Sequence, residues 1–195
     1  MDYDTIWVYG DNHNTNYPQY DGIATEHNIK QALINMVDIA DENDIIAFIT
    51  SGHGIGSAYF KAWDSGAGES SENGDFYDTE LAAILDDAVA AKIFVFLDQC
   101  QSGGFGPDLM NMGNGARVYC TTACTKAGST AEDTIHYNGY WTYYFLEYAW
   151  IDHFSGHAAI SMEAIFDYAH EAYPFSDASD SEEYDGNTSV AFYMA

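Results

Sequence analysis

The sequence predicts an α/β domain with a mainly parallel sheet and helices on both faces of that sheet. Strand-like segments alternate along the chain with segments whose apolar residues recur at helical spacing. Two strand-like segments, residues 45–50 and 92–97, are apolar at nearly every position, as strands covered on both faces are, and residues 117–122 predict a third buried strand. Because parallel strands need long crossovers, helices cover the faces of such a sheet. We expect residues 1–195 to form one domain of this kind.

The first half of the chain alternates strand-like and helix-like segments. Residues 5–9, TIWVY, form a short apolar strand, and residues 25–40 carry apolar side chains at helical spacing after a capping threonine. The strand 45–50, IIAFIT, follows a polar turn. A second helix is expected over residues 79–91, directly before the strand 92–97, KIFVFL.

The second half continues the same order after a glycine-rich stretch. Residues 117–122, RVYCTT, predict the next buried strand. Helices are expected near residues 140–151, which are rich in aromatic residues, and near residues 158–172. The acidic segment 176–187 is expected to be a loop, and residues 189–193 are expected to form the last strand.

The charge of the chain restricts its partners. There are 31 acidic and 5 basic residues, which gives a formal net charge of −26. Nucleic acids and anionic membrane surfaces would be repelled, whereas a basic peptide or protein would be attracted. No apolar run approaches the length of a membrane span, and the N-terminus lacks the basic region of a signal peptide. We therefore expect a soluble protein, and the sequence indicates neither its location nor its oligomeric state.

A histidine and a cysteine follow two of the buried strands. His53 lies in SGHG after strand 45–50, and Cys100 lies in DQCQSGG after strand 92–97. Because ligands of parallel sheets bind at the carboxyl ends of the strands, this pair favours a nucleophile and its base. A single cysteine after a buried strand is usually a small core residue, but the joint occurrence favours chemistry. The other cysteines, Cys120 and Cys124, are expected either to pair or to lie buried.

These motifs resemble the cysteine peptidases of the caspase–hemoglobinase fold, which include caspases, metacaspases, legumains, clostripain and gingipains. The histidine precedes the cysteine by 47 residues, close to the spacing in caspases. The resemblance covers roughly residues 5–150 and implies a caspase-like three-layer sandwich. Family members place another strand and helix before the segment that matches residues 5–9, so the resemblance implies that this chain lacks them, as a truncated or short form. The segments that carry the resemblance are SGHG, DQCQSGGF, RVYCTTAC, NGYWTYYFLEYAW and ATEHNIKQALINM.

The resemblance implies a role for each residue of the motifs. His53 is the base and Cys100 the nucleophile, and the backbone N–H groups of Gly54 and Cys100 form the oxyanion hole. Ser51 and Cys124, within the same motifs, are implied to contact the substrate. No cofactor is implied for the chemistry itself.

Asp98 is the candidate specificity residue. It lies two positions before Cys100 and therefore on the same face of the strand. In clostripain and metacaspases, which this motif resembles, an aspartate at this position binds the arginine or lysine of the substrate. The negative charge of the chain independently favours a basic substrate. The alternative interpretation is that Asp98 only caps the next turn.

Three other functions remain open from the sequence. A legumain-like preference for asparagine or aspartate is one, although Gly139-Tyr140-Trp141 lacks the pocket aspartate that legumains carry there, and Arg117 alone cannot build an aspartate pocket. A non-catalytic binding or scaffold module of the same fold is the second. A hydrolase of non-peptide amides or thioesters, using the same two residues, is the third.

The acidic loop over residues 64–78 is a candidate calcium site, since metacaspases and clostripain bind calcium. Its carboxylates lack the spacing of an EF-hand loop, so a solvated loop is the alternative interpretation. The residues concerned are Asp64, Glu69, Glu72, Asp75 and Asp78.

Overall fold

A four-stranded sheet forms the centre of the computed structural model, in the order β11-β8-β7-β3. Strands β3 (Ile45–Ser51), β7 (Lys92–Asp98) and β8 (Val118–Thr122) are parallel, and β11 (Glu182–Asp185) is antiparallel to β8. The structure describes residues 5–11, 20–56, 59–155, 157 and 159–194. The predicted α/β fold with a mainly parallel sheet is confirmed.

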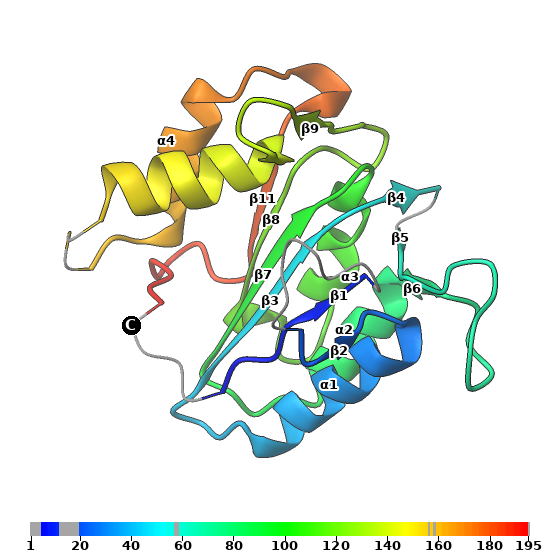
Figure 1. The fold of residues 1–195 in the computed structure, drawn as a ribbon. Coiled ribbons are helices and arrows are strands. Elements are labelled where there is room, and N and C mark those ends of the chain that lie inside the picture. The colour runs from blue at the N-terminus through cyan, green and yellow to red at the C-terminus, as the bar shows by residue number, and fades with distance from the viewer. Residues whose placement is uncertain (1–4, 12–19, 57–58, 156, 158, 195) are drawn as a thin grey trace.

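Helices cover both faces of this sheet (Figure 1). Helices α1 (Glu26–Ile39), α2 (Asp78–Asp86) and α3 (Gly106–Met110) lie on one face. The π-helix η3 (Thr142–His153) and helix α4 (Met162–Ala172) lie on the other. Each face therefore has its own hydrophobic core.

Strand β7 is apolar from Ile93 to Leu97 because helices cover both of its faces. Ile93, Val95 and Leu97 pack in the core beneath α1, α2 and α3, whereas Phe94 and Phe96 pack in the core beneath η3 and α4. All five side chains are fully buried, as the alternation of side chains along a strand between two covered faces requires. Asp98 continues the face of Phe94 and Phe96, so its carboxylate is directed toward η3.

The predicted strand over residues 5–9 is wrong in extent. The only strand in that region is β1, Tyr9–Gly10, which pairs with β2, Gly22–Ile23, outside the four-stranded sheet.

The predicted last strand, residues 189–193, is wrong, and the acidic segment supplies the strand instead. Backbone groups of Phe192 bond to helix α4, because its N–H donates to Glu163 Oε1 at 2.8 Å and its carbonyl accepts from Met162 at 2.8 Å. Strand β11 tolerates its glutamates because it lies at the edge of the sheet. Tyr119 donates its hydroxyl hydrogen to Glu183 Oε1 at 2.6 Å.

The helices differ from expectation mainly at their ends. Helix α2 ends at Asp86 rather than at residue 91, because later carbonyls are satisfied by side chains: Arg117 Nη1 donates to Val89 at 2.9 Å and Ala90 at 3.1 Å. Helix α4 begins after Ser161, whose hydroxyl accepts from the N–H of Ala164.

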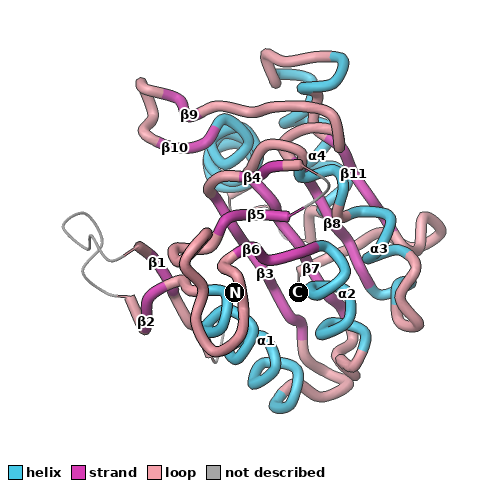
Figure 2. The backbone as a smooth tube through the Cα atoms, turned by 90° about the vertical axis from the view of Figure 1, so that its right-hand side faces the viewer, coloured by secondary structure: helices cyan, strands magenta, loops and turns pink. Residues whose placement is uncertain are grey.

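Two small antiparallel sheets lie near the carboxyl ends of β3 and β7 (Figure 2). One contains β4 (Gly54–Ile55), β5 (Tyr59–Lys61) and β6 (Asp75–Tyr77). The other is the β9–β10 hairpin, Glu132–Asp133 paired with Asn138–Gly139. Both sheets surround the end of the fold at which His53 and Cys100 are located.

No helix in the described part of the chain combines the length and apolar character needed to cross a lipid bilayer.

The fold predicts unequal roles for two tryptophans at η3. Trp141 is fully buried and donates its indole N–H to Thr121 Oγ1 at 3.0 Å, whereas Trp150 is half-buried against Phe94 and Phe145. Trp141→Phe should lower the free energy of unfolding by about 2 kcal/mol, because a cavity forms and a hydrogen bond is lost. Trp150→Phe, the matched control, should cost less than about 1 kcal/mol in urea unfolding. Equal costs for the two variants would contradict the larger contribution expected of the buried Trp141.

Candidate active site

Backbone pairing aligns the ends of β3 and β7. Ser51 lies opposite Asp98 in the parallel ladder, and the N–H of Gly52 donates to the carbonyl of Asp98 at 3.1 Å. His53 lies two residues after the end of β3, and Cys100 lies two residues after the end of β7. The predicted meeting of the two strand ends therefore exists in the structure.

A cleft of about 330 Å³ opens at this end of the sheet. It brings together four of the residues singled out from the sequence, Ser51, His53, Asp98 and Cys100. His53 is exposed and Cys100 is half-buried, so a molecule in the cleft can reach both. The complete lining is Ser51, Gly52, His53, Asp98, Cys100, Thr130, Ala131, Glu132 and Gly139.

Gly54 lies against the backbone of Cys100. A Cβ atom added to Gly54 would lie 1.9 Å from the carbonyl oxygen of Cys100, so only glycine fits. The N–H of Lys61 donates to the carbonyl of His53 at 2.8 Å. Hydrogen-bonded and non-hydrogen-bonded pairs alternate along an antiparallel ladder, so the next pair, Gly54 and Phe60, is not hydrogen-bonded. The N–H of Gly54 therefore points away from β5, as an oxyanion donor must.

A tight turn follows the candidate nucleophile. Gln101 adopts a left-handed conformation with φ of 61°, and its N–H donates to the carbonyl of Gly128 at 3.1 Å and to Cys124 Sγ at 3.1 Å. Cys124 Sγ also donates to the carbonyl of Gln99 at 3.6 Å. These bonds fix the backbone on both sides of Cys100.

The expected role of Cys124 in substrate binding does not agree with its position. Cys124 is fully buried behind the turn over residues 99–102 and is not part of the cleft lining. The reason is that the chain leaving β8 passes behind this turn before it enters the cleft wall at Thr130. Cys124 supports the turn instead.

The three cysteines are all free thiols. Cys120 and Cys124 are fully buried, and burial raises the pKa of both thiols above the ordinary value. Cys100 is the accessible one, and its Sγ donates to the carbonyl of Thr130 at 3.4 Å.

The carboxylate of Asp98 has two different environments. Oδ2 accepts hydrogen bonds from the N–H of Thr142 at 2.8 Å and from its hydroxyl at 2.6 Å, so this oxygen caps the start of η3 and not the turn that directly follows β7. Oδ1 is buried and has no hydrogen-bond partner among the residues that the structure describes. An unpaired buried carboxylate oxygen in a cleft is suited to binding a cationic or hydrogen-bonding ligand.

The protonation of Asp98 reflects this environment. Burial raises the pKa of its carboxyl, the two hydrogen bonds from Thr142 lower it, and the negative charge of Glu132 raises it further. The net effect is a pKa above the ordinary value of an aspartate. Asp98 thus behaves as a buried acid whose charge a bound cation would stabilise.

Gly139 completes the floor of the cleft. A Cβ atom at this position would lie 2.1 Å from Asp98 Oδ2, so the hairpin packs directly on the carboxylate. No sequence pattern indicated Thr130, Glu132 or Thr142 at the site, because none of them directly follows a predicted strand. Thr130 and Glu132 lie in the segment between β8 and η3, and Thr142 is the first residue of η3.

The acidic loop does not gather its carboxylates into one site. Asp64 accepts from the N–H of Glu26 at 3.0 Å, at the start of α1, and Glu72 lies 3.5 Å from Lys30. Over the described ranges, no group of three histidine, cysteine, aspartate or glutamate side chains is arranged to hold a metal ion. The remaining three acids have separate positions: Glu69 accepts from Thr25, Asp75 accepts from Ser65, and Asp78 begins α2.

Comparison with known proteins extends the description of the fold. No protein-family model matches the chain, and no curated protein matches it significantly. The crystal structure of protein GSU0716 from Geobacter sulfurreducens is similar, with a TM-score of 0.58 over 88% of this chain and 79% of that one. Only 13% of the residues are identical, so the likeness shows the fold alone.

The positions of the three cysteines predict selective alkylation. Substoichiometric iodoacetamide should modify Cys100 before Cys120 or Cys124 in the native protein, because the latter two are buried thiols with raised pKa values. Peptide mass spectrometry after short exposure measures the order. Cys100→Ser should remove the fast phase, and equal labelling of all three native thiols would contradict the assignment.

Proposed function

We propose that the protein is a cysteine endopeptidase that cleaves peptide bonds after arginine or lysine. The observation that carries the proposal is that one cleft is lined by His53, Cys100 and the buried Asp98, from two adjacent strand ends. A thiol, an imidazole and a buried acid together supply a nucleophile, a base and a binding site for a cation. The resemblance of SGHG and DQCQSGGF to caspase–hemoglobinase peptidases supports the same conclusion.

In this proposal the two helical layers and the sheet correspond to a caspase-like three-layer sandwich. Strand β3, which ends two residues before His53, lies at the edge of the four-stranded sheet. Its carboxyl end is aligned with that of β7, because the two strands pair with each other along their whole length.

The first half of the reaction forms an acyl-enzyme. The imidazole of His53 accepts the proton of the Cys100 thiol, and the thiolate attacks the carbonyl carbon of the scissile bond. The N–H groups of Gly54 and Cys100 stabilise the oxyanion of the tetrahedral intermediate. The carbon–nitrogen bond then breaks, and the leaving amine takes the proton from the His53 imidazolium.

The second half hydrolyses the resulting thioester. His53 removes a proton from a water molecule, and the oxygen of this water attacks the thioester carbonyl. The carbon–sulfur bond breaks, the carboxylic acid product leaves, and the sulfur of Cys100 regains its proton from His53. Because a thiolate cannot donate a hydrogen bond, the contact from Cys100 Sγ to the carbonyl of Thr130 belongs to the resting thiol.

Asp98 supplies the preference for a basic residue before the cleaved bond. Thr142 already occupies Oδ2, so the cationic group meets Oδ1. A charge-assisted hydrogen bond to a buried carboxylate is stronger than one between neutral groups. The net charge of −26 raises the local concentration of basic substrates around the cleft.

The proposed dyad predicts complete loss of activity in two single variants. On fluorogenic peptides that differ only in the residue before the cut, the wild type should cleave after arginine and lysine. Cys100→Ala and His53→Ala should each lower kcat by about a thousandfold or more, because nucleophile and base act as a unit. The exposed His157 on another part of the fold gives a control, His157→Ala, which should retain full activity. Retained activity in Cys100→Ala, or a wild type that cleaves no peptide, would favour the non-catalytic or non-peptide alternatives.

The pocket predicts a selective effect of Asp98→Asn. The value of kcat/KM for basic substrates should fall by about a hundredfold or more, with a smaller loss for neutral ones, because the buried charge pair is lost. Asparagine retains an oxygen for Thr142, so thermal unfolding should show a folded variant.

The pH dependence gives a second measurement on Asp98. In the wild type the preference for basic over neutral substrates should decline as the pH falls through the pKa of Asp98, which burial raises above the ordinary value of an aspartate. Asp98→Asn should show no such decline. A wild-type preference for asparagine or aspartate would replace the pocket assignment with the legumain-like one.

A further inference from the structure

Glu132 is a second carboxylate of the cleft that the proposed mechanism does not use. It is exposed, it begins β9, and it lies opposite Gly139 in the antiparallel pair with β10. Gly139 is the residue that packs on the carboxylate of Asp98. Glu132 and Asp98 therefore line the same cleft, and Gly139 contacts both of them.

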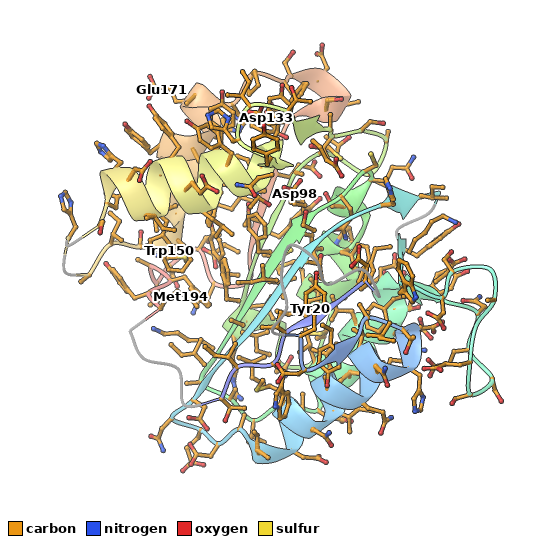
Figure 3. All side chains as sticks on the ribbon, in the orientation of Figure 1. Tyr20, Asp98, Asp133, Trp150, Glu171 and Met194 are labelled. Carbon is orange, nitrogen blue, oxygen red and sulfur yellow. The ribbon has the colours of Figure 1, made fainter. Side chains whose placement is uncertain are left out.

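The hairpin that carries Glu132 is held in place on both sides. The N–H of Tyr140 donates to the carbonyl of Ala131 at 3.1 Å, next to Glu132. Asp133 accepts hydrogen bonds from the N–H of Ile135 at 2.7 Å and from the ring of His136. The His136 ring in turn stacks on Tyr143 of η3, with ring centroids 3.6 Å apart. Figure 3 shows Asp133 on this hairpin above Asp98 at the end of β7.

Asp98 alone cannot satisfy a guanidinium group. Oδ2 accepts two hydrogen bonds from Thr142, which leaves Oδ1 as the oxygen without a partner in the described structure. A two-pronged pair between both oxygens of one carboxylate and an arginine is therefore not available. Arginine has five N–H donors in a planar fork, and the remaining donors need another acceptor in the cleft.

Glu132 is placed to provide this acceptor, because it lines the same cleft as Asp98 and pairs with Gly139, which packs on the carboxylate of Asp98. Its negative charge raises the pKa of Asp98, so the two carboxylates repel each other. A cation between them removes that repulsion and is attracted by both. A compact ammonium group is satisfied by one carboxylate and water, whereas the wider guanidinium fork spans acceptors on two different elements.

We infer that Glu132 is a second specificity residue, which binds the guanidinium group of a substrate together with Asp98 Oδ1 and so selects arginine over lysine. The inference rests on the proposed peptidase function for its biological meaning. The two-carboxylate site itself is a property of the cleft and can be measured without peptide cleavage.

The kinetic test compares Glu132→Gln with Glu42→Gln, an exposed glutamate in the turn before β3 and therefore at the opposite end of the sheet. Glu132→Gln should lower kcat/KM for arginine substrates by about tenfold, mainly by raising KM. The decrease in kcat/KM for lysine substrates should be smaller. The ratio of arginine to lysine cleavage should fall toward one, while neutral substrates are unaffected. Glu42→Gln should change none of these values.

The binding test uses alkylation of Cys100 by iodoacetamide as its signal. Butylguanidine should slow this alkylation at lower concentration than pentylamine in the wild type, and Glu132→Gln should remove the difference. Protection that depends on Glu132 in a protein that cleaves no peptide would retain the inference and reject the peptidase. A different result would overturn only the inference about Glu132 and leave the peptidase proposal intact. In that case cleavage after basic residues depends on Asp98, but Glu132→Gln changes neither the arginine-to-lysine ratio nor the protection pattern.

Discussion

The site depends on the parallel pairing between β3 and β7. Seven consecutive residue pairs join the two strands, from Ile45 with Lys92 to Ser51 with Asp98. A shift of one residue would turn Asp98 away from η3 and move Phe94 and Phe96 out of their core, at a cost of several buried aromatic side chains. Core packing thus fixes the register, and the register fixes the distance between the segments that carry His53 and Cys100.

The two oxygens of the Asp98 carboxylate have separate roles, one in the structure and the other in the proposed binding of a substrate. Oδ2 caps the start of η3 through Thr142, while Oδ1 remains without a partner in the described structure. Burying a charge without full compensation is unfavourable, so this side chain reduces the stability of the empty protein. Such uncompensated groups concentrate at binding sites, where a ligand supplies the missing interaction. Capping of η3 by one oxygen and the proposed binding by the other are therefore compatible.

Sequence patterns predicted the parts of the fold that depend on burial, and missed those that depend on distant pairing. The strands over 45–50 and 92–97 were recognisable because nearly every position is apolar, and His53 and Cys100 were recognisable because they lie just beyond the carboxyl ends of these strands. Strand β11 was missed because its glutamates suit only the edge of a sheet. The β9–β10 hairpin has two residues in each strand, too few for a periodic pattern, so the contribution of Glu132 to the cleft was not visible from the sequence.

The contact between Gly139 and Asp98 means that neither residue can be replaced by a larger one without disturbing the other. Any side chain at residue 139 would overlap the carboxylate, with a Cβ atom 2.9 Å from Oδ1 as well as 2.1 Å from Oδ2. Conversely, a longer acid at residue 98 would press against the hairpin backbone. The two positions are therefore energetically coupled, and their substitutions are expected to be non-additive. A protein with this fold would acquire a new ligand preference most readily at Glu132 on the rim, where a side chain changes without displacing the backbone.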